Sequence, residues 1–172
     1  MLKLIGAALL LFAGTMAGFA QSLALARRPR QIRELIQALQ RLETEIAYGM
    51  TPLAEALASA GRPLSEPVAR IFRGAADRLL GPGQLTAEAC WQQAVEESWA
   101  GTALREAERE VLRQLAYSLG VSDREDQRQH LKLAVAQLQA EETEAAEQNR
   151  RFGSMWKSLG VLAGALLVVL MY

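Results

Sequence analysis

The side chains capable of catalysis or metal binding are few and scattered. Cys90 is the only cysteine and His130 the only histidine among 172 residues. A single cysteine excludes an internal disulfide and a cysteine-rich zinc site, and neither residue has the neighbouring partners that identify a nucleophile or a metal ligand set. We therefore expect Cys90 to be a small buried hydrophobe and His130 to pack at or near the surface of a helix.

Pairs of carboxylates are the other candidates for chemistry. They are adjacent or one helical turn apart in charged segments, where a solvated helix face explains them without an acid, a base or a metal. The pairs are Glu96 with Glu97, Asp123 with Asp126, and Glu141 with Glu142. The loop Gly81-Pro82-Gly83 lacks the Gly-Lys-Ser/Thr that holds phosphates, so it predicts a turn. We expect no enzyme, and no catalytic, cofactor or metal residues.

The two ends of the chain are apolar and bound a domain between them. Leu4 to Ala26 carries no charge and would span about 34 Å as a helix, which is enough to cross a bilayer. The last 15 residues are also apolar, and entry from about Phe152 brings them near membrane length. We predict transmembrane helices at 1–26 and 158–172 around a domain at 27–157. A cleaved signal peptide is the alternative for the first helix, although the basic cluster after Ala26 disfavours export.

Basic residues flank both apolar ends on the sides that face the domain. They are Arg27, Arg28, Arg30, Arg150, Arg151 and Lys157. Because positive flanks stay inside, the two spans would anchor the protein in the cell membrane with a cytoplasmic domain and outward termini. Between Gln31 and Asn149, 12 Lys and Arg stand against 19 Asp and Glu, a balance of −7. Such an acidic domain is not expected to bind nucleic acid.

The acidic excess predicts contact with a partner protein, against the competing interpretation of a solvated face. Its densest group is Glu141, Glu142, Glu144 and Glu147. Within the apolar ends, two small-xxx-small spacings favour close helix packing, and they also arise by chance. These are Gly14 with Gly18, and Gly160 with Gly164. Whether the protein forms a homo-oligomer is left open by the sequence.

Apolar residues at spacings of three and four predict six helices in the middle of the chain. The clearest stripe ends near Gly49 and comprises Ile32, Leu35, Ile36, Leu39, Leu42 and Ile46. Capping residues predict where the later helices begin, namely Thr51-Pro52, Ser65, Thr86, Thr102 and the capping box Ser122-Asp123-Arg124-Glu125. The prediction is an all-α antiparallel bundle of about six helices, flanked by the two transmembrane helices.

Two stretches resemble a known family. The run RQIRELIQALQRLETEIAYGMTPLAEAL, from Arg30 to Leu57, resembles stage III sporulation protein AB of spore-forming bacteria. The segment LGVSDREDQRQHL, from Leu119 to Leu131, resembles the start of that family's last soluble helix. The resemblance covers essentially the whole chain.

The resemblance implies a soluble domain similar to that of the type II secretion inner-membrane platform protein. It also implies a place in the complex between mother cell and forespore, in the mother-cell membrane around the forespore. The expected partners are a secretion-type ATPase, the AA subunit, and other stage III sporulation membrane proteins. The resemblance implies no catalytic residues in this chain, because none are known in the family. Two alternatives are a regulatory membrane protein whose bundle binds a ligand, and a membrane-associated hydrolase.

Overall fold

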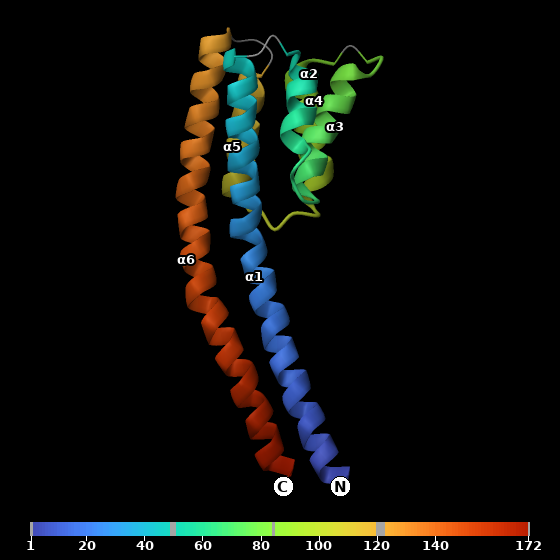
Figure 1. Ribbon diagram of the computed structural model, residues 1–172, viewed down its shortest axis with the longest axis vertical. Helices are drawn as coiled ribbons and strands as arrows, with labels where there is room; N and C mark the ends of the chain where they lie inside the picture. Colours follow the sequence, from blue (N-terminus) through green and yellow to red (C-terminus); the bar gives the residue numbers. More distant parts are fainter. Residues whose placement is uncertain (1, 49–50, 84, 120–122, 172) are drawn as a thin grey trace. The chain divides into compact units, whose positions relative to one another are not determined.

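The computed structural model describes the backbone of residues 2–48, 51–83, 85–119 and 123–171 (Figure 1). It describes side chains for residues 26–48, 51–83, 85–119, 123 and 125–152, and for residues 16, 23, 155, 158 and 162. The chain forms two compact units. One joins Met1–Pro29 with Thr143–Tyr172, and the other is Arg30–Glu142.

Six helices account for the regular structure, and no strand occurs in the described ranges. They are α1 (Leu2–Tyr48), α2 (Leu53–Gly61), α3 (Val68–Leu80), α4 (Ala87–Trp99), α5 (Glu106–Ser118) and α6 (Arg124–Met171). The prediction of an all-α fold is confirmed. The first helix is longer than its predicted apolar stripe, because the backbone remains helical through Pro29.

The core of the Arg30–Glu142 unit follows the predicted stripe. Ile32, Leu35, Leu39 and Leu42 of α1 are fully buried, whereas Ile36 and Ile46 are only partly covered. Burying a Leu or Ile side chain contributes about 1.5–3 kcal/mol, so these four residues are a main source of the bundle's stability.

Helices α2, α3 and α4 pack in succession around two aromatic rings. The rings of Phe72 and Trp91 meet edge to face, with 5.2 Å between their centroids. Helix α2 approaches α3 so closely at Gly61 that a Cβ there would lie 2.6 Å from the Cβ of Phe72. The absence of a side chain at Gly61 therefore sets the distance between these two helices.

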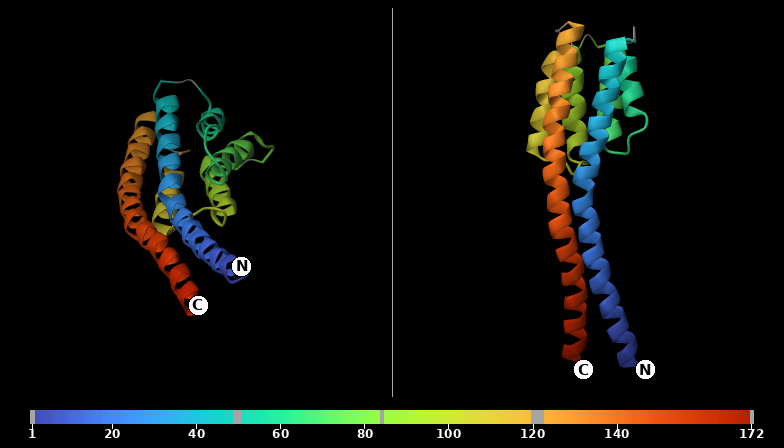
Figure 2. Two further views of the ribbon diagram at one scale, coloured as in Figure 1. Left: turned by 60° about the horizontal axis from the view of Figure 1, so that its bottom comes forward. Right: turned by 60° about the vertical axis from the view of Figure 1, so that its left-hand side comes forward.

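Several polar contacts fasten α1 to later elements of the same unit, and three of them follow. The Oε1 of the buried Gln31 accepts a hydrogen bond from the backbone N–H of Ala103, at 2.7 Å. Arg33 pairs with Glu142 at 2.7 Å. The Nζ of Lys132 on α6 lies 3.8 Å from Oε1 of Glu43 on α1. Within this unit α1 and α6 run side by side, as Figures 1 and 2 show.

The predicted start of α4 at Thr86 is confirmed, and α6 begins one residue later than the capping box predicts, with Asp123 as its cap. The Thr86 hydroxyl accepts a hydrogen bond from the backbone N–H of Ala89 and caps α4. At α6, Oδ1 of Asp123 accepts the N–H of Asp126 at 2.9 Å, as an N-terminal cap does. Ser122, the first residue of the predicted capping box, lies outside the described residues.

Two other predicted caps are wrong because their hydroxyls bind elsewhere. Ser65 donates to both carboxylate oxygens of Glu34 at 2.7 Å, and α3 begins three residues later at Val68. Thr102 donates to the Trp99 carbonyl at 2.8 Å, and α5 begins only at Glu106.

The start of α2 also differs by one residue from the prediction. Pro52, rather than Thr51, is the capping residue, and it adopts an extended conformation before Leu53. The Thr51 hydroxyl donates instead to Glu45 at 3.2 Å. In all three cases a hydroxyl expected to cap a helix bonds to a group outside that helix.

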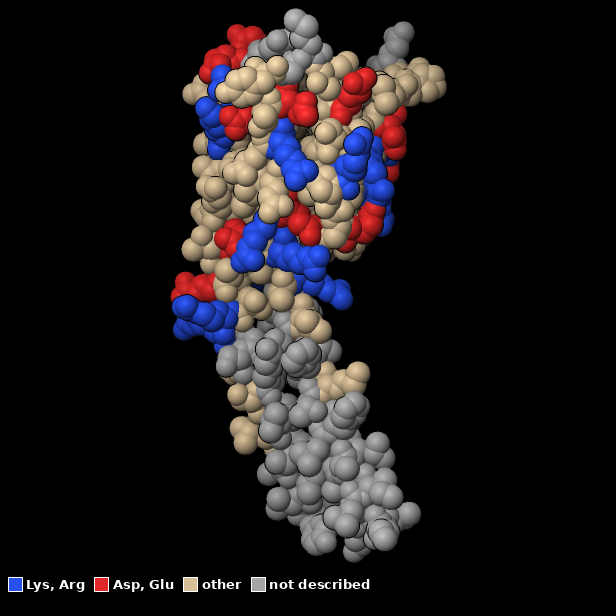
Figure 3. Space-filling view, in the orientation of Figure 1, with Lys and Arg blue, Asp and Glu red and all other residues tan. Residues whose placement is uncertain are grey.

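The surface carries charges of both signs. On the face in Figure 3, Lys and Arg are interspersed with Asp and Glu over the bundle.

Among the described residues, no helix combines the length and the hydropathy of a membrane span.

Candidate functional site

Helices α4 and α5 form a groove on the surface of the Arg30–Glu142 unit. Each helix contributes residues at the spacing of one helical face, so the two faces together make one elongated site. The lining comprises Trp91, Gln92, Val95 and Glu96 from α4, and Arg109, Leu112, Arg113 and Tyr117 from α5. The groove encloses about 300 Å³.

The floor of this groove is apolar. Trp91, Val95 and Leu112 are buried there. The only polar atom of the Trp91 ring, its Nε1–H, donates to the Leu112 carbonyl at 2.9 Å and so ties α4 to α5. With that donor already used, the buried Trp91 ring offers no hydrogen bond to the groove.

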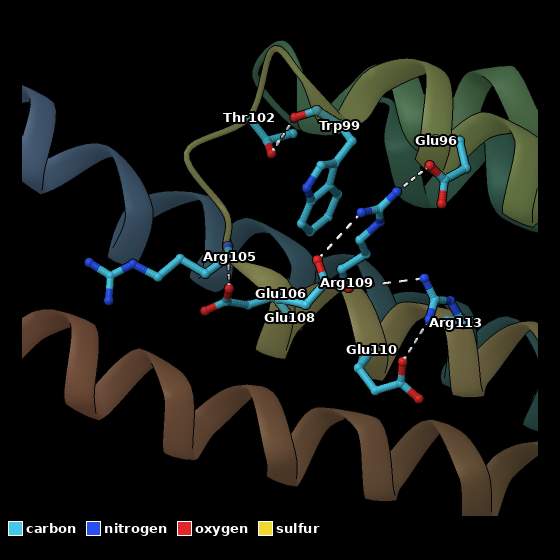
Figure 4. A network of polar contacts seen from close by, with 9 residues as sticks. All are labelled: Glu96, Trp99, Thr102, Arg105, Glu106, Glu108, Arg109, Glu110 and Arg113. Atoms are coloured by element: carbon cyan, nitrogen blue, oxygen red, sulfur yellow. Dashed lines mark hydrogen bonds and ion pairs between the residues drawn. The ribbon is translucent and has the colours of Figure 1, made fainter.

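Arg109 forms the fixed part of the rim (Figure 4). Its guanidinium pairs with Glu96 across the two helices and with Glu106 one turn earlier on α5, and it lies 5.5 Å from the centre of the Trp99 ring. Hydrogen bonding to Glu96 raises the pKa of Arg109 above its ordinary value, with Glu106 adding to the effect. Arg109 is therefore a permanent cation held in one place.

Of the charged residues that line the groove, Glu96 is acidic and Arg109 and Arg113 are basic, and Glu106 and Glu110 lie beside them on α5. Arg113 pairs with Glu110 at 3.1 Å and lies 4.0 Å from Glu106. Three carboxylates thus surround two guanidiniums. The side chains of Glu96 and Glu106 are 53% and 69% exposed, and those of Arg109 and Arg113 are 24% and 43% exposed, so charges of both signs reach the solvent.

Glu108, on the same helix, has a structural role that sequence reasoning missed. Its side chain is fully buried, and its Oε2 accepts a hydrogen bond from the backbone N–H of Arg105 at 2.6 Å. This bond fixes the first turn of α5. The available signal was a glutamate three residues after the true N-cap, Arg105, but Thr102 was predicted to be the cap.

A second, more open groove lies between α5 and α6. It has a volume of about 360 Å³ and is lined by Ala107, Glu110, Val111, Gln114, Gln137, Ala140 and Glu141. Its floor is made of alanines and a valine, and its edges carry amides and carboxylates. It brings Glu141, predicted to contact a partner, to the edge of a surface depression.

The four glutamates predicted to contact a partner are not equally available. In the Arg30–Glu142 unit, Glu141 is partly buried and Glu142 accepts a hydrogen bond from Arg33. In the unit of the chain ends, Glu144 and Glu147 are exposed, and Glu144 accepts a hydrogen bond from Gln148. Glu142 therefore supports the fold, whereas Glu144 and Glu147 are surface residues.

The predicted small-residue pairs in the apolar ends fall on residues whose side chains lie outside the described set. They are Gly14, Gly18, Gly160 and Gly164. Their role in helix packing stays a prediction.

The other candidates for chemistry adopt the plainer roles expected of them. Cys90 is buried, and burial raises the pKa of its thiol. His130 is exposed and lies 3.6 Å from Asp126. Glu97 pairs with Arg78. Among the side chains that the structure describes, no three His, Cys, Asp or Glu converge as metal ligands.

Comparison with known proteins gives one consistent result. The family model for stage III sporulation protein AB matches residues 3–172. Stage III sporulation protein AB of Bacillus subtilis (strain 168) is 42% identical over 171 residues, which is 99% of each chain. A solved structure of a stage III sporulation protein AB superimposes with a TM-score of 0.68 at 40% identity, covering 72% of this chain and 97% of that one. The resemblance noted from Arg30 to Leu57 is confirmed.

Proposed function

Because the chain belongs to the stage III sporulation protein AB family, we propose that it is a non-catalytic adaptor of a secretion-like channel complex in sporulation. In this role the cytoplasmic bundle couples a secretion-type ATPase, the AA subunit, to a membrane assembly between mother cell and forespore. Other stage III sporulation membrane proteins complete that assembly. The names of the relatives refer to sporulation and to no reaction.

One observation carries the choice of an adaptor over a ligand-binding bundle. Three buried polar side chains of the Arg30–Glu142 unit bond to the protein's own backbone: Gln31 to Ala103, Ser118 to Leu115 and Glu108 to Arg105. Each therefore stabilises the fold of the bundle, and none of these bonds is aimed into an internal cavity. The surface is left as the part of the bundle that meets other molecules.

The membrane placement is part of the same proposal. Residues 1–26 and 158–172 would lie in the mother-cell membrane around the forespore, with the bundle in the cytoplasm. The support is the uncharged length of Leu4 to Ala26, the apolar C-terminal end, and the basic residues on the domain side of each.

The acidic surface provides the contact with the ATPase in this proposal. The −7 balance of residues 31–149 would steer a basic surface toward the bundle. Of the four glutamates on α6, only Glu144 and Glu147 suit a reversal experiment. Changing Glu142 to Lys would set a positive charge against Arg33, and Glu141 is partly buried.

The experiment measures binding of the purified AA-type ATPase to the full chain in lipid nanodiscs. The double variant Glu144→Lys/Glu147→Lys should weaken binding by about tenfold at low salt, and less at high salt. The matched control is Glu55→Lys/Asp77→Lys, which makes the same change of net charge at two exposed acidic positions on α2 and α3. Equal weakening by both variants would reduce the effect to net charge. Absence of binding by the unchanged chain would refute the proposed partner.

A further inference from the structure

We propose that the end of the bundle at which α1 enters binds the phosphate headgroups of anionic lipids in the membrane that holds the chain. The site is built by Arg30, Arg62 and Arg105, three exposed arginines from different parts of the chain. The inference rests on the proposed membrane placement and adds a contact between the bundle itself and the bilayer.

Three segments that are far apart in the sequence meet at this end of the Arg30–Glu142 unit. Helix α1 holds the loop between α2 and α3 through Glu34, whose carboxylate accepts a hydrogen bond from the Ser65 hydroxyl at 2.7 Å. It holds the loop between α4 and α5 through Gln31, whose Oε1 accepts the backbone N–H of Ala103 at 2.7 Å. Both loops are therefore fixed beside the same turn of α1.

The two loops also approach each other. A Cβ placed on Gly101 would lie 3.4 Å from the Cβ of Pro67. Figures 1 and 2 show both loops at the end of the bundle where α1 enters it. Arg62 belongs to the first loop and Arg105 to the second, so the fold brings both to the end that carries Arg30.

This end is basic, although the unit as a whole is acidic. Residues 30–34, 62–70 and 100–105 together carry five Arg and two Glu, a balance of +3. The other residues of the Arg30–Glu142 unit carry 8 Lys and Arg against 15 Asp and Glu, a balance of −7. Positive charge is therefore concentrated where the three segments meet.

The carboxylates at and beside this end are already bound to other groups of the protein. The pairs are Glu34 with Arg30 and Ser65, Glu66 with Arg70 and Arg73, Glu106 with Arg109, and Glu142 with Arg33. Arg62 and Arg105, in contrast, are exposed and form no ion pair with a side chain that the structure describes. Figure 4 shows Arg105 extending away from Glu106 and Glu108. Two guanidinium groups are thus placed to receive an anion.

A lipid phosphate is the anion that the position of this end favours. Ala26, the last residue of the predicted first span, precedes Arg30 by four residues, so even an extended chain keeps Arg30 within about 14 Å of the span. Guanidinium groups bind phosphate oxygens through paired N–H donors, and basic residues near an anionic leaflet are attracted to it. Nucleic acid is disfavoured by the −7 balance of the rest of the unit.

The test uses the full chain in micelles of an uncharged detergent, titrated with phosphatidylglycerol. Binding is followed by NMR through the backbone amide resonances of Leu64 and Ala103, one in each loop. Phosphatidylglycerol should shift both resonances, and the shift should diminish at high salt. Phosphatidylcholine with the same acyl chains and inorganic phosphate are the companion titrations, and neither should shift them.

Two variants of the site separate charge from geometry. Arg62→Gln/Arg105→Gln should weaken phosphatidylglycerol binding by about 25-fold, because each basic residue near an anionic surface contributes about fivefold. Arg62→Lys/Arg105→Lys keeps the charge and should lose less than about threefold. The matched control is Arg41→Gln/Lys132→Gln, which makes the same change of net charge at exposed positions of α1 and α6 further from this end. The control should bind as the unchanged protein does.

Four results would overturn the proposal. An equal shift with phosphatidylcholine would remove the requirement for an anionic lipid, and an equal shift with inorganic phosphate would make the site one for a free anion. An equal loss in the control variant would reduce the effect to net charge. Weaker binding of the AA-type ATPase to Arg62→Gln/Arg105→Gln in nanodiscs of phosphatidylcholine alone would make the occupant a partner protein.

Failure of this inference can be told apart from failure of the proposed function. A positive lipid result beside absent ATPase binding would refute the proposed partner and leave the lipid site standing. A negative lipid result beside normal ATPase binding would overturn the lipid site and leave the adaptor standing.

Discussion

The Nε of Arg33 on α1 donates a hydrogen bond to Oε1 of Glu142 on α6 at 2.7 Å, between residues 109 apart in the chain. This pair and the Lys132–Glu43 pair, ten residues away along each helix, join the first and last helices of the Arg30–Glu142 unit. Both pairs are solvent-accessible, so each contributes at most about 1 kcal/mol. The two pairs therefore mainly fix the position of α1 along α6, whereas the stability of the unit comes from its apolar interior.

Leu39→Ala tests that interior. Leu39 is fully buried on α1, so its truncation should lower the free energy of unfolding by about 2–5 kcal/mol. Thermal unfolding of the full chain in micelles, followed by circular dichroism, measures the loss. The control Leu133→Ala removes the same atoms at a position 53% exposed and should change stability by less than about 0.5 kcal/mol. Similar losses in both would show that the wrong face has been assigned to the core.

Gly61→Ala tests the close approach of α2 and α3. The new Cβ would lie 2.6 Å from the Cβ of Phe72, which cannot move aside like the end of a flexible side chain. Overpacking of this kind should destabilise the protein by about 1–3 kcal/mol. At Gly83 the nearest atom to a new Cβ is 3.8 Å away, so Gly83→Ala should be neutral or slightly stabilising. A neutral Gly61→Ala would contradict the helix spacing.

Gln31→Leu tests the hydrogen bond that holds the α4–α5 connection. The substitution leaves the backbone N–H of Ala103 without its acceptor, which should cost about 1–3 kcal/mol. Amide hydrogen exchange at Ala103 should accelerate as well. Gln37→Leu, at an exposed position on the same helix, is the matched control and should leave that exchange unchanged.

The buried thiol of Cys90 predicts a dependence on alkaline pH. Burial raises its pKa above the ordinary value of 9.0, so the folded state holds the proton more tightly than the unfolded state. The resulting stability is complete below a pH of about 9 and falls as the pH rises further. Wild-type protein should therefore lose more stability than Cys90→Ala when the pH is raised from about 8 to about 10. A parallel decline in both would exclude a contribution from the thiol.

Thiol labelling tests the proposed topology. Gly83→Cys and Gln93→Cys, each in a Cys90→Ser background, place a thiol at an exposed position of the bundle. In intact cells both should resist a membrane-impermeant reagent and react after permeabilisation. Tyr172→Cys, predicted to face outward, should label in intact cells. Ready labelling at Gly83→Cys without permeabilisation would overturn the cytoplasmic placement.

The helices could be predicted from the sequence because apolar spacing records which face is buried, and Ile32, Leu35, Leu39 and Leu42 behave accordingly. Helix starts were less predictable. The Ser65 hydroxyl is suited to a cap by local rules, but its acceptor is Glu34, 31 residues earlier in the chain. A hydrogen-bond acceptor so far away in the chain cannot be identified from the spacing of neighbouring residues.

The groove itself could not be predicted for a similar reason. The sequence shows Arg109 and Glu106 as a pair one helical turn apart. The position of the Arg109 guanidinium also depends on Glu96 and Trp99 of the preceding helix. Alternating charges in a segment are ordinary on helix surfaces. Only the packing of α4 against α5 turns them into the rim of one site.

The pairing of α1 with α6 also affects the order in which the protein is completed on the ribosome. Arg33 is translated 109 residues before Glu142, an interval of roughly 5–20 s at bacterial elongation rates. During that interval α1 has emerged without the helix that carries Leu131 and Leu138 into the interior. The nascent chain therefore cannot complete the bundle until translation is nearly over. Messages truncated before α6 should yield products that are readily degraded.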